Sequence, residues 1–119
     1  MAQTNVRDLF DLKPTEQIFD DFSCKEGALS SGRMYITENY LCFFWSMIGF
    51  SKKIKIMWTD ITSIEVKSSS IRIIASTEKD PISFSGFSDF QTSSKYIQKL
   101  WQAARGADSD EQSETENEQ

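Results

Sequence analysis

The chain has 119 residues, of which 39% are hydrophobic and 13% aromatic, and it carries a formal net charge of -5 with no histidine. This length suffices for one domain with a buried core. Because histidine is the commonest general base and metal ligand, its absence argues against most hydrolases and metalloenzymes. Cys24 and Cys42 cannot make an ordinary zinc site, and their apolar, strand-like neighbours are typical of buried cysteines. We therefore expect no catalytic residue, no metal and no cofactor.

The acidic excess lies at the end of the chain, in residues 108–119. This segment contains six carboxylates and no basic, apolar or aromatic residue, so it cannot bury enough surface to offset the entropy of ordering it. We expect a disordered acidic tail, in which Ser113 and Thr115 are candidate phosphorylation sites because a glutamate follows each by three positions. Residues 1–107 hold all 13 basic and 12 of the acidic residues, a net charge of +1, and are expected to form the folded domain.

In the first half of the chain, the spacing of the apolar residues changes from helix-like to strand-like. Proline fits the first turn of a helix, so a short helical turn is expected at Pro14-Thr15-Glu16. Alternation with period two then predicts strands at residues 20–25, 28–37 and 40–45. The Glu38-Asn39 pair offers a tight turn, so the last two strands form a hairpin.

Four further strands are predicted at residues 53–58, 64–67, 71–75 and 82–84, with polar turns between them. Residues 88–91 (SDFQ) then have the form of a helix capping box. An apolar stripe follows with helical spacing and ends before Gly106; it comprises Phe90, Ile97, Leu100, Trp101 and Ala104. The predicted fold is mainly β (α+β), a pleckstrin-homology-like barrel of about seven antiparallel strands closed by a C-terminal amphipathic helix.

Several separated motifs occur in an order typical of one family. They are residues 32–37 (GRMYIT), residues 39–43 (NYLCF), Gly49-Phe50 before a lysine-rich strand, Asp60-Ile61 with Ile64, and Tyr96-Ile97 with Leu100-Trp101. With these motifs the sequence resembles a GRAM domain over about residues 8–104. The resemblance implies a pleckstrin-homology-like fold and a membrane-targeting module that binds anionic phospholipids such as phosphatidylserine or phosphoinositides. Lys13 departs from the family pattern, in which proline usually follows leucine directly.

Residues 45–55 (WSMIGFSKKIK) join an apolar turn to a lysine-rich strand. Met47, Ile48 and Phe50 are candidates for insertion into the bilayer, and the candidates for binding anionic headgroups are Lys52, Lys53 and Lys55. Each lysine near an anionic surface contributes about 1 kcal/mol, so three lysines alone bind weakly and insertion must supply the rest. In the alternative reading, the apolar residues fold back onto the barrel and the lysines are only the solvated face of a strand.

Two other basic residues and three tryptophans have weaker patterns. Lys25 and Arg33 flank the first predicted hairpin turn, where pleckstrin-homology domains often place phosphate-binding residues. Their spacing does not reproduce the usual basic motif, so an exposed polar face is the favoured interpretation of both, with headgroup binding as the alternative. Trp45, Trp58 and Trp101 lie on the apolar side of their elements and are expected in the core.

The sequence therefore predicts a non-enzymatic module that binds anionic phospholipids peripherally at the cytosolic face of a membrane. No apolar run approaches the roughly 20 residues that span a bilayer, and the N-terminus lacks the apolar region of a signal peptide, so a cytoplasmic location is expected. The near-neutral domain is unlike a nucleic-acid binder. The alternative is a protein-interaction adaptor that binds a peptide at the barrel edge beside the closing helix.

Overall fold

The computed structural model describes residues 5–27 and 30–108 of the chain. The elements in chain order are α1 (Val6–Leu9), β1 (Ile18–Glu26), β2 (Ser30–Thr37), β3 (Tyr40–Met47), β4 (Phe50–Met57), the 3-10 helix η1 (Trp58–Asp60), β5 (Ile61–Val66), β6 (Ser70–Ala75), β7 (Ile82–Ser85) and α2 (Phe90–Asp108). The described residues contribute seven strands to one antiparallel sheet, in the order β4-β3-β2-β1-β7-β6-β5. The predicted strand number and C-terminal helix are confirmed.

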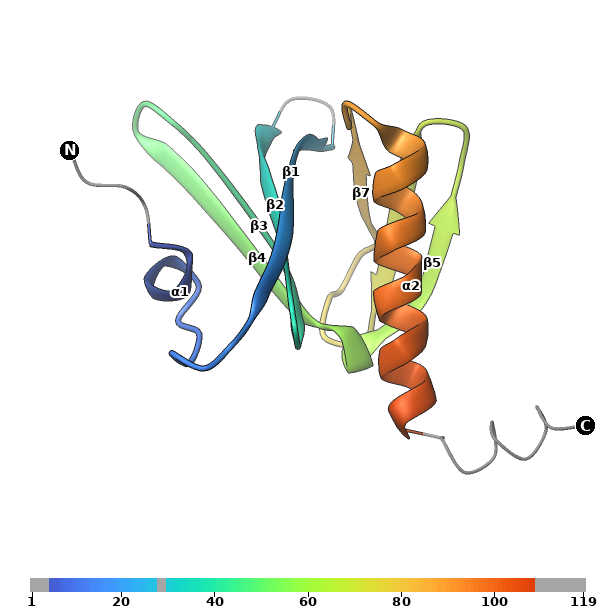
Figure 1. Ribbon diagram of the computed structural model, residues 1–119. Coiled ribbons are helices and arrows are strands. Elements are labelled where there is room, and N and C mark those ends of the chain that lie inside the picture. The colour runs from blue at the N-terminus through green and yellow to red at the C-terminus, as the bar shows by residue number, and fades with distance from the viewer. Residues whose placement is uncertain (1–4, 28–29, 109–119) are drawn as a thin grey trace, which may run out of the picture.

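The sheet bends into two halves, β1–β4 and β5–β7 (Figure 1). Within the described residues, strand pairing joins the two halves at the end of β1, through the pairs Lys25–Ser85 and Glu26–Phe84. β4 and β5 are the outermost strands of the sheet, because η1 carries the chain from one half to the other without pairing them. The sheet is therefore open along this seam, and side chains rather than backbone hydrogen bonds fill it.

The core lies between the two halves, where alternate side chains of each strand meet. Met34 and Ile36 of β2, Phe43 of β3 and Phe84 of β7 are fully buried there. The rings of Phe43 and Phe84 have centroids 5.3 Å apart and link the halves directly. Burial of each such side chain stabilises the fold by about 1.5–3 kcal/mol. Alternation in the sequence predicts this inward face because successive strand residues point to opposite sides.

α2 covers the open side of the core with the predicted apolar stripe. Ile97 is fully buried, and the indole Nε1 of Trp101 donates to the carbonyl of Ile61, 2.9 Å away. The predicted capping box assigns the N-terminal cap of α2 to the wrong residue. The side chain of Asp89, not that of Ser88, accepts a hydrogen bond from the backbone amide of Thr92 in the first turn. The predicted end of the helix is also wrong: α2 continues through Gly106 to Asp108. A glycine so close to a helix end costs only about 1 kcal/mol.

The N-terminal segment, residues 5–17, packs on the outer face of the β1–β4 half. Its helix, α1, precedes the predicted position because the Asn5 side chain accepts from the amides of Arg7 and Asp8 and so starts a helix there. Around Pro14 the chain makes only a turn, with the amide of Glu16 donating to the carbonyl of Lys13. The ring of Phe10 is buried against Tyr35, which fixes the segment on β2.

The turns of the sheet lie at two opposite ends of the molecule. The β3–β4, β5–β6 and β7–α2 turns lie at one end, the upper end in Figure 1. The β2–β3 turn, η1 and the end of α2 lie at the other. The apolar turn predicted to enter a membrane is therefore at the far end from η1, at the tip of a projecting hairpin.

Candidate functional site

The tip of the β3–β4 hairpin exposes three large apolar side chains. Met47 pairs with Phe50, which leaves Ile48 and Gly49 as the turn, and Gly49 adopts a φ of 84° that favours glycine. The exposed fractions are 98% for Ile48, 66% for Phe50 and 59% for Met47. The alternative in which Met47 and Phe50 fold back onto the barrel does not describe this tip. Such clustered exposure is uncommon on a soluble surface and marks a candidate contact site.

The three lysines behind the tip lie on both faces of β4. Lys52 shares the inward face with Ile54, and its Nζ lies 3.2 Å from a carboxylate oxygen of Glu26. Lys53 and Lys55 point to the outer face, where they donate to the carbonyls of Leu9 (3.0 Å) and Asp11 (3.4 Å). All three lysines remain exposed, but they do not form a single cluster.

The carbonyls that hold Lys53 and Lys55 belong to the N-terminal segment, which a buried carboxylate anchors. Glu16 is only 5% exposed and accepts from the Oγ1 of Thr37 (2.8 Å), the backbone amide of Asn39 (2.7 Å) and the side-chain amide of Asn39 (2.9 Å). Burial raises the pKa of Glu16, but these hydrogen bonds and the positive charge of Lys55 together hold the pKa below its ordinary value. The carboxylate is therefore charged at neutral pH and fixes the segment beside β4.

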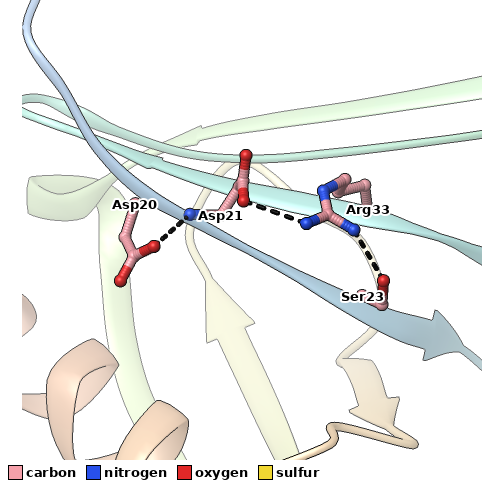
Figure 2. Close-up of polar contacts among 4 residues, drawn as sticks. All are labelled: Asp20, Asp21, Ser23 and Arg33. Carbon is pink, nitrogen blue, oxygen red and sulfur yellow. Dashed lines mark hydrogen bonds and ion pairs between the residues drawn. The ribbon is translucent and has the colours of Figure 1, made fainter.

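Lys25 and Arg33 come together on the outer face of β1 and β2. The guanidinium of Arg33 donates to the hydroxyl of Ser23 (2.6 Å) and to the carboxylate of Asp21 (3.1 Å), as Figure 2 shows. The carboxylate of Asp20 instead accepts from the backbone amide of Asp21 (Figure 2). Lys25 lies two residue pairs further along, opposite Ser31, and its side chain makes no hydrogen bond or ion pair with another described residue.

Two depressions lie near these basic residues. One, of about 320 Å³, lies between β4 and the β6–β7 loop, and its charged lining is Glu26, Lys52, Glu78, Lys79 and Asp80. This mixture has more carboxylates than amines, which disfavours a strongly anionic ligand there. The other, of about 310 Å³, is lined by Ser23, Cys24, Lys25, Ser31, Gly32 and Gly86. Lys25 is the one charged group in that lining.

Several residues that contact these basic side chains were not predicted from the sequence. Glu26 neutralises Lys52, and Asp21 and Ser23 hold Arg33, although no motif connects them. Strand alternation could have placed Ser23 and Lys25 on one face, because Cys24 between them is apolar. The tail candidates Ser113 and Thr115 lie outside the described residues.

The tryptophans and cysteines are structural, as predicted. Trp58 is buried and donates to the carbonyl of Thr37 (3.0 Å), whereas the Nε1 of the partly buried Trp45 has no partner among the described residues. Cys24 and Cys42 are buried, and burial raises the pKa of each thiol to about 12. Thiols with such pKa values are unreactive at neutral pH.

The described residues contain no helix that is long and apolar enough to cross a membrane. They also contain no group of three or more side chains able to hold a metal ion.

An open seven-stranded sheet covered by a C-terminal helix has the pleckstrin-homology-like fold. The solved structure of the Vps36 N-terminal PH domain shares this fold, with a TM-score of 0.61 at 10% identity, over 78% of this chain and 84% of that one. A family model for the GRAM domain matches residues 4–105. The chain therefore belongs to the GRAM domain family.

Two curated relatives match most of the chain. Protein Aster-B of Homo sapiens is 28% identical over 108 residues, which cover 84% of this chain and 14% of Aster-B. The membrane-anchored lipid-binding protein LAM5 of Saccharomyces cerevisiae is 28% identical over 92 residues, which cover 72% of this chain and 14% of LAM5. The chain thus spans about one seventh of the length of these relatives.

Proposed function

We propose that the domain binds the cytosolic surface of an anionic membrane peripherally by inserting the tip of the β3–β4 hairpin. The observation that carries this proposal is the exposure of Met47, Ile48 and Phe50 together at the end of a projecting hairpin. The kinship with a membrane-anchored lipid-binding protein supports a lipid surface as the partner. Phosphatidylserine and phosphoinositides are the anionic lipids that the lysines behind the tip would meet.

The spacing along β4 ranks those lysines. Strand residues advance by about 3.3 Å, so Lys52 and Lys53 lie roughly 7–10 Å behind Phe50 and Lys55 lies about 17 Å behind it. An apolar segment that enters the interface is buried by roughly 5–10 Å. Lys52 and Lys53 would then lie at the level of the headgroups, with Lys52 weakened by Glu26. Lys55 would mainly hold the N-terminal segment.

The energy expected from this arrangement is modest. Burial of Ile48 contributes about 2 kcal/mol, and the two-thirds exposed Phe50 and Met47 about 1.5 kcal/mol each. Two lysines at the surface add about 1 kcal/mol each. The total of about 7 kcal/mol is an upper value, since immobilising the domain has its own cost, and it corresponds to reversible binding of about 10 µM or weaker.

Co-sedimentation with phosphatidylserine vesicles tests the proposal. Ile48→Asp removes the insertion energy and adds a repelled charge, together about 3 kcal/mol, so binding should fall about 100-fold. Met57→Asp is the matched control, because Met57 is also partly exposed on β4 but lies at the opposite end of the strand. Equal binding of wild type and Ile48→Asp would refute tip insertion. Absence of binding by the wild type would favour the peptide-binding adaptor.

A further inference from the structure

Two serines lie opposite each other in the β3–β4 hairpin, directly behind its apolar tip. Ser46 and Ser51 form a residue pair, and the pair Met47–Phe50 separates them from the turn. Both serines are exposed, and neither hydroxyl makes a hydrogen bond within the part of the chain that the structure describes. The packing of the fold therefore does not use these two hydroxyls, and both are accessible to an enzyme that modifies them.

The end of the hairpin can present these serines as part of an extended strand. Among the described residues, the pairing of β2 with β3 ends at Arg33–Phe44, whereas the pairing of β3 with β4 continues to Met47–Phe50. The hairpin projects at this end of the molecule (Figure 1), and β4 is the last strand of the sheet on its side. A two-stranded hairpin without further support is marginally stable in water, so its end opens locally at little cost. An enzyme that binds an extended substrate strand can therefore reach Ser51 without unfolding the domain.

The two serines differ in the charge of their neighbours along the chain. Lys52 and Lys53 follow Ser51 directly, whereas an apolar residue lies on each side of Ser46. The charges that flank a serine decide which protein kinases accept it, and a kinase with an acidic substrate groove selects serines beside basic residues. Such a kinase should modify Ser51 rather than Ser46.

A negative charge at position 51 would oppose membrane binding. Strand residues advance by about 3.3 Å, so Ser51 lies between Phe50 and the lysines, within the roughly 5–10 Å that an inserted segment buries. A phosphoserine carries a charge of about -1.5 to -2, and an anionic surface repels this charge as it attracts lysines. Ser51 and Lys53 also share the outer face of β4, about 7 Å apart, so the phosphate could bind the Lys53 ammonium group and neutralise it.

We propose that Ser51 is a phosphorylation site whose modification releases the domain from an anionic membrane. The Oγ of Ser51 attacks the γ-phosphorus of a nucleoside triphosphate held by a serine/threonine protein kinase. The new O–P bond replaces the bond to the nucleoside diphosphate, and the base of the kinase accepts the hydroxyl proton. This inference rests on the proposed function, because release requires that the hairpin tip inserts. It assigns a site within the hairpin, separate from the tail candidates Ser113 and Thr115.

Incubation of the folded protein with ATP and the catalytic fragment of protein kinase C, followed by mapping of the modified residue by mass spectrometry, tests the acceptor without a membrane. We expect a phosphate on Ser51, which Ser46→Ala keeps and Ser51→Ala loses. Ser46→Ala is the matched control, because Ser46 is also exposed and pairs with Ser51 but lacks flanking lysines. Phosphate on Ser46 in preference to Ser51, or no phosphate on either serine, overturns the inference.

Co-sedimentation with phosphatidylserine vesicles tests the release. One unit charge near an anionic surface changes the affinity about five-fold, so the phosphorylated protein should bind about 30-fold more weakly than the unmodified protein. Ser51→Asp adds one negative charge without a kinase and should weaken binding about five-fold, whereas Ser51→Asn, which has the same shape without the charge, should bind like wild type. Equal sedimentation of the phosphorylated and unmodified proteins overturns the inference.

Ile48→Asp separates a failure of this inference from a failure of the proposed function. Vesicle binding that Ile48→Asp weakens but phosphorylation of Ser51 does not weaken refutes the switch and leaves tip insertion standing. Vesicle binding of the unmodified protein that is absent, or that is insensitive to Ile48→Asp, refutes tip insertion, and the switch is refuted with it.

Discussion

Replacing Glu16 with glutamine should destabilise the domain, because the Glu16 carboxylate is the anchor of the N-terminal segment. The carboxylate accepts three hydrogen bonds from Thr37 and Asn39, whereas glutamine has one acceptor oxygen and turns an NH2 group toward donors. Hydrogen bonds to charged groups are worth about 1.5–3 kcal/mol each. We expect Glu16→Gln to lower the free energy of unfolding by about 3 kcal/mol at pH 7.

The same substitution has a defined pH dependence. The folded-state pKa of Glu16 lies below its ordinary value of 4.5, so its charge stabilises the fold fully above that value. The stabilisation is lost as the pH falls through the lower, folded-state pKa. The difference between wild type and Glu16→Gln should therefore shrink below about pH 4.5, and it should be constant between pH 6 and 8.

Urea unfolding followed by tryptophan fluorescence measures both effects. Glu38→Gln is the control, because Glu38 is an exposed carboxylate of the adjacent turn and its replacement should change stability by less than about 0.5 kcal/mol. The reasoning is refuted if Glu16→Gln is as stable as wild type at pH 7, or if its deficit is independent of pH.

The packing supports three other predictions, on two glycines, two tryptophans and the two cysteines. A Cβ at Gly32 would collide with the backbone of β3, so Gly32→Ala should cost about 3 kcal/mol in thermal unfolding, whereas Gly49→Ala meets only the strain of a positive φ and should cost about 1 kcal/mol. Trp58→Phe loses a buried hydrogen bond and should lower the free energy of unfolding by about 1–2 kcal/mol. Trp45→Phe removes a donor that has no partner among the described residues and should lower it by less. The reverse order in urea unfolding would contradict this reasoning. Both cysteines should resist thiol reagents at pH 8 until the protein unfolds, and fast labelling of the native protein would show that they are not buried.

The fold could be predicted from the sequence because its main determinants are local. Alternation of apolar residues places Met34, Ile36 and Phe43 on the inward face, and a helical stripe places Ile97 against them. The open seam between β4 and β5 could not be predicted, since it depends on how η1 connects the halves. Helix ends were predicted less well: the Asn5 and Asp89 side chains fix the starts of α1 and α2, and α2 passes through Gly106.

The candidate site also combines features that the sequence could predict with features that it could not. The exposed tip could be predicted, because large apolar residues in a two-residue turn have no partner strand to cover them. The partners of the lysines could not, since Glu26 is 26 residues from Lys52 and Leu9 is 44 residues from Lys53. These contacts depend on strand register and on the packing of the N-terminal segment. The sequence ranked the hairpin lysines above Lys25, but each hairpin lysine donates to an acceptor of the chain, whereas the side chain of Lys25 contacts no acceptor in the part of the chain that the structure describes.

Depth-dependent quenching of a fluorophore at position 48 tests tip insertion most directly. Ile48→Cys supplies the attachment site, and the buried native thiols should not compete for the label. With phosphatidylserine vesicles that carry nitroxides on the acyl chains, the label at position 48 should be quenched and a label at Met57→Cys should not. Equal quenching at the two positions, or a label at position 48 that stays accessible to an aqueous quencher on bound vesicles, would contradict insertion of the hairpin tip.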